Sequence, residues 1–533
     1  MTIKGRTVRR LVALAIALGL LGWNYQHKRG QQTTDAETPA IAPAASTAKP
    51  VQAKPATWQL GRLTLTACEL AQPNSGLSTA AWCAPFDVPE NRDDPGSRKI
   101  TLKLAVIRSN AQVASRDMLV LLAGGPGQAA TESWSGVAAA LQPLQAHRHI
   151  VLLDQRGTGS SHPLDCKPGA EADTDDEEGI SGFNPGKLRN EATRCLKQLE
   201  GKADPRYYTT TVAVQDLEDV RQALGTPTLG APTFNLVGVS YGTRMAQQYL
   251  LRHPDAVRSM VLDGVVPNTL VLGEDFAPNL DAALKAQFAR CAADAVCKQR
   301  FGDPYQTLYQ LRDALRANPH AVSFRDPQTY KTVKRPLDEY SLASVVRMFA
   351  YTPLTAALLP LSIDAAAHGD VGPLLGQAKL LSGDLADTMN GGMQSSVICS
   401  EDADLLTPRP QDAHSILGTR MIDTLQAVCS VWPKGTRPAD FHQPLKTDKP
   451  VLLLSGEYDP VTPPRNGDEV AKGLSNARHL VLKGQGHNVI AAGCAPKLLK
   501  RFIEDLAPAK LDASCLDRLQ ATPIFVDFNG ATP

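Results

Sequence analysis

A serine flanked by two glycines lies near the middle of this 533-residue chain. Residues 238–242 read Gly-Val-Ser-Tyr-Gly, which matches the pattern G-x-S-x-G. In this pattern the serine sits on a sharp turn from a strand into a helix, where glycines let the backbone crowd without a Cβ clash. The N-terminus of the following helix favours developing negative charge at the serine. We therefore predict that Ser240 is a nucleophile.

Such a serine needs a histidine base and a carboxylate that orients the histidine, in the chain order serine, acid, histidine. Asp459 follows the apolar run 451–454, and Glu457 is a second choice closer to that run. His487 follows the apolar run 479–482 in a glycine-containing loop. We predict Asp459 as the acid and His487 as the base.

A glycine-rich loop, Ala-Gly-Gly-Pro-Gly at 123–127, follows the apolar run 118–122. Glycines allow backbone N–H groups to point at a substrate oxygen that becomes negatively charged. The residue after the nucleophile usually supplies a second N–H group. We predict that Gly125 and Tyr241 are the two donors, although a purely structural turn would use the same glycines.

Strands alternating with helices must position these residues. Residues 100–107 alternate between apolar and polar, as in a half-buried strand. Short apolar runs, typical of strands covered on both faces, lie at 118–122, 149–153, 233–238, 259–263, 451–454 and 479–482. With helical segments between several of them, the sequence predicts an α/β-hydrolase fold, a mostly parallel sheet flanked by helices.

The alternation stops between residues 275 and 395, which are rich in Ala, Leu and Gln and have helical periodicity. We call this segment the cap and expect a helical insertion over the sheet. It divides the hydrolase core into residues 58–274 and 396–533. Residues 26–57, rich in Ala, Thr and Pro, are expected to be a linker.

Residues 1–25 have the pattern of an export signal. Basic residues at 4, 6, 9 and 10 precede an apolar run over 11–23, which is shorter than the about 20 residues that span a bilayer comfortably. No clear cleavage site follows, so a cleaved signal peptide and an uncleaved N-terminal anchor both fit. We expect a periplasmic or extracellular protein, either free or tethered to a membrane.

The ten cysteines agree with export into an oxidising compartment. Sequence neighbours offer five short-range disulfides, although the sequence leaves other connectivities open: Cys68 with Cys83, Cys166 with Cys195, Cys291 with Cys297, Cys399 with Cys429, and Cys494 with Cys515. Their spacing does not match metal sites, so neither a metal nor another cofactor is expected. The 55 basic and 54 acidic residues give no electrostatic case for nucleic-acid binding.

The chain resembles the prolyl and tripeptidyl aminopeptidases among the α/β-hydrolases. The resemblance rests on Gly-Gly-Pro-Gly at 124–127, Asp-Gln-Arg-Gly-Thr-Gly-Ser at 154–160 and the serine motif, and it covers most of residues 60–520 apart from the cap. Segments 455–463 and 484–487 are similar to the tripeptidyl branch. Prolyl members usually have His where this chain has Ala123, which also favours that branch. The resemblance implies release of short N-terminal units from peptides with a free N-terminus, through an acyl-enzyme and without a metal.

The resemblance also implies acidic residues at or near the cap that bind the substrate's ammonium group. Glu401 and Asp402, directly after the cap, are the candidates, and Asp263 and Asp275 are weaker alternatives. A polar loop without this role remains equally open.

Asp154 and Arg156 belong to the most specific of the shared motifs. Because they follow a predicted buried strand, we expect a buried charge pair under the oxyanion loop that braces the site.

Three functions fit these observations. An exported serine aminopeptidase is favoured by the resemblance. A carboxylesterase, or another small-substrate serine hydrolase, would use the same three residues. A non-catalytic binding protein on this fold would be expected to lack one of them, and all three are present.

Overall fold

The computed structural model describes residues 56–73, 76–166, 184–327 and 329–531. The predicted export segment and all but the end of the predicted linker lie outside these ranges. Within them, no helix is both long enough and apolar enough to span a membrane.

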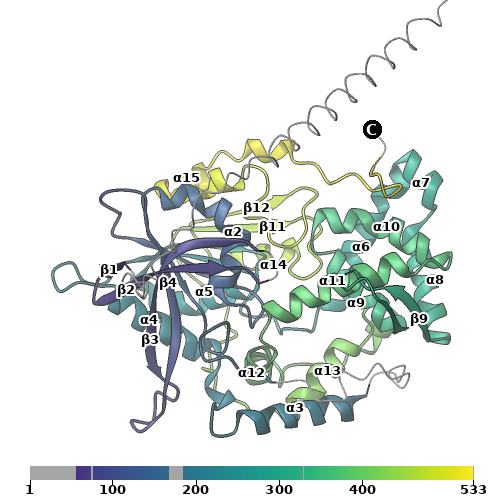
Figure 1. Ribbon diagram of the computed structural model, residues 1–533. Coiled ribbons are helices and arrows are strands. Elements are labelled where there is room, and N and C mark those ends of the chain that lie inside the picture. Colours follow the sequence, from purple (N-terminus) through teal and green to yellow (C-terminus); the bar gives the residue numbers. More distant parts are fainter. Residues whose placement is uncertain (1–55, 74–75, 167–183, 328, 532–533) are drawn as a thin grey trace, which may run out of the picture. The chain divides into compact units, whose positions relative to one another are not determined.

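Ten strands form one sheet in the order β1-β2-β3-β4-β6-β5-β7-β8-β11-β12 (Figure 1). The pairings from β6 through β12 are parallel, and those from β1 through β4 to β6 are antiparallel. The strands are β1 (Thr57–Leu60), β2 (Leu63–Ala71), β3 (Ser78–Pro89), β4 (Lys99–Ile107), β5 (Met118–Leu122), β6 (Ile150–Leu153), β7 (Phe234–Val239), β8 (Val257–Asp263), β11 (Val451–Gly456) and β12 (Ala477–Leu482). Every run predicted as a strand is a strand, so the predicted mostly parallel sheet is confirmed.

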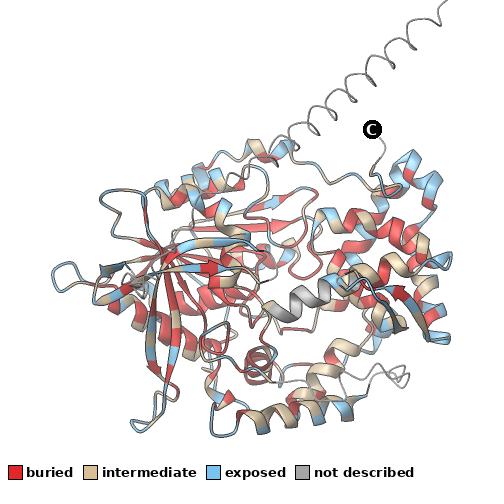
Figure 2. Cartoon of the chain, in the orientation of Figure 1, coloured by how far each residue is buried: buried red, intermediate tan, exposed pale blue. Residues whose placement is uncertain are grey.

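Helices cover both faces of the sheet, which explains the uninterrupted apolar runs. On β7, the neighbours Leu236 and Val237 belong to two different apolar clusters. Leu236 packs in the cluster that includes α4 (Thr210–Ala223) and α5 (Tyr241–Arg252), and Val237 in the cluster that includes α2 (Ala130–Gln145) and α15 (Ala495–Asp505). Strands β5, β6, β7 and β11 are buried along their whole length, and Figure 2 shows the middle of the sheet as buried. The remaining helices outside the cap are α3 (Pro185–Leu199), α12 (Gly391–Glu401, which begins within it), α13 (Arg420–Cys429) and α14 (Pro464–Ala471).

The cap has an apolar core of its own, which includes Leu284, Leu342 and Phe349. Its helices are α6 (Phe276–Ala293), α7 (Ala295–Phe301), α8 (Pro304–Ala317), α9 (Glu339–Phe349), α10 (Pro353–Ala367) and α11 (Gly372–Thr388). It also contains an antiparallel hairpin, β9 (His320–Arg325) and β10 (Thr332–Leu337), which the sequence did not predict. Of the hairpin side chains only Phe324 and Leu337 are buried, so these strands carry no apolar run.

All five predicted short-range disulfides are present. Cys399–Cys429 joins α12 to α13, and Cys494–Cys515 fastens the chain after α15 to the beginning of that helix. Each bridge limits the conformations open to the unfolded chain and so stabilises the fold.

The carboxyl ends of the parallel strands meet at one edge of the sheet, since parallel strands run in the same direction. The segments that follow β5, β7, β8, β11 and β12 carry, in that order, the glycine loop 123–127, Ser240, Gly264, Asp459 and His487. The topology therefore gathers the residues singled out in the sequence.

Candidate active site

Ser240 occupies a strained turn between β7 and α5. Its backbone has φ 54° and ψ −123°, and its N–H group donates to the carbonyl of Asp263 at 2.8 Å. A Cβ on Gly242 would lie 2.1 Å from the carbonyl oxygen of Leu122, and one on Gly238 would lie 2.5 Å from the carbonyl oxygen of Gly242. The motif needs glycine at both places because the helix passes close to β5 and β7.

Asp459 and His487 form a buried hydrogen-bonded pair. Nδ1 of His487 lies 2.7 Å from Oδ2 of Asp459. The other carboxylate oxygen accepts the N–H groups of Val461 and Thr462, both at 2.8 Å, and the Thr462 hydroxyl donates to Oδ2 at 2.8 Å. These bonds fix the carboxylate so that it can hold one imidazole orientation. Glu457, the second choice for the acid, is exposed and accepts the N–H group of Gly484, so it braces the histidine loop instead.

The charges of the pair shift both pKa values. Burial alone would lower the pKa of His487, but the charge of Asp459 and its hydrogen bond raise it above the usual value of 6.5. Burial would raise the pKa of Asp459, but His487 and the donors around it lower the pKa below 3.8. A carboxylate that stays ionised and an imidazole whose protonated form is favoured suit an acid–base relay.

The shift of the His487 pKa predicts an acid limb in the activity. Only the neutral imidazole can accept a proton, so kcat/KM should fall as the pH drops through a pKa above 6.5. In Asp459→Asn the stabilising charge is lost, and the limb should move to lower pH in the residual activity. Profiles of kcat/KM against pH for both proteins check this, and an unmoved limb would contradict the pairing.

Asp263 and Gly264, at the end of β8, connect the serine and histidine segments. The carbonyl of Asp263 binds the N–H of Ser240, and its carboxylate accepts the N–H groups of Val489 and Ile490, both at 2.9 Å. A Cβ on Gly264 would lie 3.0 Å from Cε1 of His487. Sequence reasoning considered Asp263 only for ammonium binding, and the signal for this other role is an aspartate that ends a buried strand.

The glycine loop lies against the serine. A Cβ on Gly124 would come within 3.2 Å of the Cβ of Ser240. Gly125 and Gly127 have φ of 108° and 113°, and the Gly125–Pro126 peptide bond is cis. Tyr241 begins α5, so its N–H group has no acceptor within the helix. Of the predicted donors, Gly125 thus belongs to the loop that lies against Ser240, and Tyr241 directly follows Ser240 at the start of α5.

A family model described as the alpha/beta hydrolase fold matches residues 117–492, which is more than half of the chain. This chain belongs to the α/β-hydrolase fold family. The matched region begins just before β5 and includes Ser240, Asp459 and His487.

Relatives of this α/β hydrolase carry both peptidase and esterase names. Serine protease Hip1 of Mycobacterium tuberculosis is 27% identical over 84% of this chain and 88% of its own. Carboxylesterase B of the same species is also 27% identical, over 87% of this chain and 90% of its own. Tripeptidyl aminopeptidase of Streptomyces lividans is 29% identical over 34% of this chain and 35% of its own. The chain is a serine hydrolase, and the resemblance to the peptidase branch agrees with two of these three names.

Asp154 and Arg156 are both fully buried, but they do not pair with each other as predicted. Arg156 forms a two-pronged ion pair with Asp216 of α4, at 2.6 and 2.7 Å. Asp154 accepts the N–H and hydroxyl groups of Thr131 at 2.8 and 2.9 Å, at the start of α2. Motif spacing placed both residues after β6 but could not show that their side chains reach different helices.

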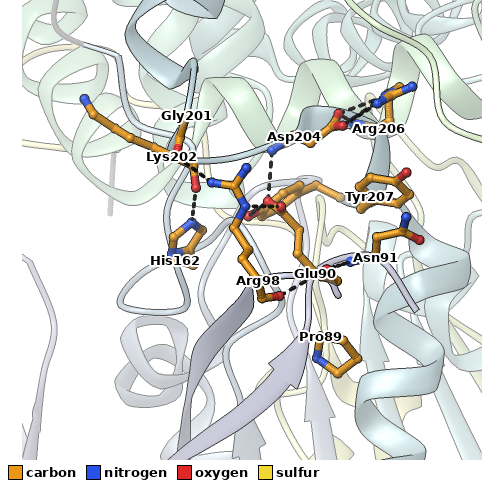
Figure 3. A network of polar contacts seen from close by, with 12 residues as sticks. Pro89, Glu90, Asn91, Arg98, His162, Gly201, Lys202, Asp204, Arg206 and Tyr207 are labelled. Carbon is orange, nitrogen blue, oxygen red and sulfur yellow. Dashed lines mark hydrogen bonds and ion pairs between the residues drawn. The ribbon is translucent and has the colours of Figure 1, made fainter. Parts of the chain in front are cut away.

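A polar network beside Arg156 fastens the end of β3 to the segment before α4 (Figure 3). Arg156 donates to the carbonyl of Glu90, and the Glu90 carboxylate binds Arg98 at 2.7 Å. The same carboxylate accepts the N–H of Asp204 at 2.9 Å and the hydroxyl of Tyr208 at 3.0 Å. We assign this network a structural role, because its charged groups form hydrogen bonds and ion pairs with other residues of the chain.

Glu401 and Asp402 both lie fully buried with partners from this chain. Asp402 pairs with Arg244 at 2.9 Å. Glu401 accepts the N–H and hydroxyl groups of Thr210, whose oxygen also lies 2.6 Å from the hydroxyl of Tyr241. Burial, together with the charge of Asp402, raises the pKa of Glu401 to about 8. Both carboxylates are thus engaged within the fold, and binding of an ammonium group by them stays a prediction.

The weaker alternatives for the ammonium site are also engaged. Asp275 pairs with Arg409 at 2.8 Å, and the carboxylate of Asp263 is bonded to the histidine loop.

The cap contacts both catalytic loops. The carbonyl of Tyr351 accepts the N–H of His487 at 2.7 Å, and the two rings meet edge to face at 5.4 Å. At the other end, the N–H of Asn390 donates to the carbonyl of Gly127 at 2.9 Å. A Cβ on Gly125 would lie 3.1 Å from the sulfur of Met389. Tyr351 thus borders the histidine side of the site, and Met389 borders the oxyanion side.

Proposed function

We propose that this serine hydrolase is an exported aminopeptidase that releases short N-terminal units from peptides. The serine-hydrolase chemistry in this proposal rests on the buried Asp459–His487 pair, which is joined through Asp263 to a serine on a strained turn beside a glycine loop. The motif resemblance and the relatives named as peptidases support amides as substrates.

In the proposed mechanism the Ser240 hydroxyl attacks the scissile carbonyl carbon while its proton passes to His487. The N–H groups of Gly125 and Tyr241 stabilise the oxyanion. The carbon–nitrogen bond then breaks, His487 gives the proton to the leaving amine, and an ester on Ser240 remains. Water, deprotonated by His487, hydrolyses this ester and regenerates the serine. Asp459 holds the imidazole and stabilises its protonated form.

Five disulfides support export, because such bridges form and persist in oxidising compartments. The basic and apolar pattern of residues 1–25 points the same way.

A carboxylesterase is the second candidate. One relative with that name is as similar as the serine protease, and the carboxylates predicted to bind an ammonium group are engaged elsewhere. Ester hydrolysis would use the same residues with an easier leaving group.

Three substrates separate the two candidates. A tripeptide p-nitroanilide with a free N-terminus, its N-acetylated form and a p-nitrophenyl ester are compared by kcat/KM. We expect the free amide to be cleaved and the acetylated amide to be cleaved much more slowly. Equal cleavage of both amides would contradict an aminopeptidase, and turnover of the ester alone would favour the carboxylesterase.

A further inference from the structure

Arg347 brings a positive charge to the histidine side of the site. It lies in α9, four residues before Tyr351, whose carbonyl and ring contact His487. Burial and Asp459 have the largest effects on the pKa of His487, followed by Asp263, and the positive charge of Arg347 has a smaller effect that lowers this pKa. Among the charged side chains with this influence, Asp459 and Asp263 belong to the core and Arg347 comes from the cap.

The guanidinium of Arg347 is held in place by an aromatic ring rather than by a carboxylate. It lies over the ring of Phe276, at the start of α6, with 4.7 Å between its central carbon and the ring centroid. Within the described part of the chain it forms no ion pair, whereas other cap arginines do, such as Arg300 with Asp364 and Arg316 with Glu339. A stacked guanidinium keeps its N–H donors available for an anion.

The chemistry of acyl transfer decides which part of a substrate this charge meets. The acyl carbonyl must lie at Ser240 and the oxyanion loop, where Met389 borders the site. The leaving nitrogen must lie next to His487, because His487 protonates it. Tyr351 contacts His487 on that side, and Arg347 precedes Tyr351 by only four residues, which brings its charge toward the leaving part of the substrate.

We propose that Arg347 is a specificity-determining residue that binds a carboxylate on the leaving part of the substrate. This inference rests on the proposed aminopeptidase function and adds a class of preferred substrates. These are short peptides in which the residue after the scissile bond carries a negative charge, either as its own C-terminal carboxylate or as an acidic side chain. A charge-assisted bond to guanidinium is directional and strong enough to select among leaving groups.

The test varies only the leaving residue. Alanine peptides are made in lengths of two, three and four residues. For each length the last residue is alanine with a free carboxylate, alanine amide or glutamate amide. Mass spectrometry follows release of the last residue, and kcat/KM is determined for the wild type, Arg347→Gln and Arg300→Gln. The last variant is the matched control, because Arg300 also lies over a phenylalanine ring in the cap, at 4.9 Å, but is paired with Asp364.

For the wild type we expect kcat/KM to be about tenfold to a hundredfold higher for a carboxylate-bearing leaving residue than for alanine amide. Arg347→Gln should bring this ratio close to one, and Arg300→Gln should leave it unchanged. Preference for the free carboxylate alone identifies the C-terminal carboxylate as the ligand, and preference for glutamate amide identifies the side chain. A wild-type ratio near one, or a preference that survives in Arg347→Gln, would overturn the proposal.

The pH dependence of kcat/KM distinguishes an effect of the Arg347 charge from a loss of packing, because a loss of packing alone would not shift the acid limb. Since the charge of Arg347 lowers the pKa of His487, Arg347→Gln should shift the acid limb of kcat/KM to higher pH. Comparison of free and acetylated N-termini tests the aminopeptidase function by itself. Failure at the C-terminal side therefore refutes the role of Arg347 and leaves that function standing.

Discussion

Replacing Ser240 with alanine is expected to lower kcat by about 10⁴-fold or more, because the acyl-enzyme can no longer form. The fold should survive, since alanine removes one oxygen and keeps the Cβ that the turn already accommodates. Hydrolysis of the best amide or ester found for the wild type measures the loss. Thermal unfolding measured in parallel should show little change.

Ser455→Ala is a suitable control. Ser455 is buried on β11 and its hydroxyl lies 2.9 Å from Nε2 of His479, outside the proposed machinery. A fluorophosphonate should label Ser240 in the wild type and should fail to label Ser240→Ala. The Ser455→Ala variant should keep both its hydrolytic activity and its labelling by the fluorophosphonate. Full activity of Ser240→Ala would refute the proposed nucleophile, whatever the substrate.

Much of the fold could be predicted because its signals are local in the sequence. The strands of the parallel part are covered on both faces, so each appears as an uninterrupted apolar run such as Phe234–Val239. The serine turn is local as well, since Gly238 and Gly242 are required by contacts with the adjacent strand and helix. The disulfides could be paired because each joins cysteines that are neighbours in the sequence, such as Cys291 and Cys297.

The remaining features depend on contacts between distant segments. Arg156 bonds to Asp216, sixty residues further along, rather than to Asp154 two residues away. The buried carboxylate of Glu401 accepts a hydrogen bond from Thr210, which lies 191 residues earlier in the sequence. The contact of Tyr351 with His487 could not be predicted either, because nothing in the composition of the cap indicates which of its turns touches the core.

Asp263→Asn is expected to reduce kcat by about tenfold to a hundredfold and to move the acid limb to lower pH. Burial raises the pKa of Asp263 to about 6, while the N–H groups of Val489 and Ile490 and the charge of His487 act to lower it. The carboxylate is therefore mostly ionised at neutral pH and accepts both N–H groups. Asparagine has one acceptor oxygen and would turn its NH₂ group toward the other donor, which displaces the loop of His487.

The direction of the pH shift separates this role from a loss of stability. The negative charge of Asp263 raises the pKa of His487. Removing this charge should therefore move the acid limb of kcat/KM to lower pH, opposite to the shift expected for Arg347→Gln. Asp402→Asn is the control, because Asp402 is an equally buried carboxylate whose partner is Arg244. That variant should unfold at a lower temperature and keep the wild-type limb. If Asp263→Asn did the same, Asp263 would support the fold without acting on the histidine.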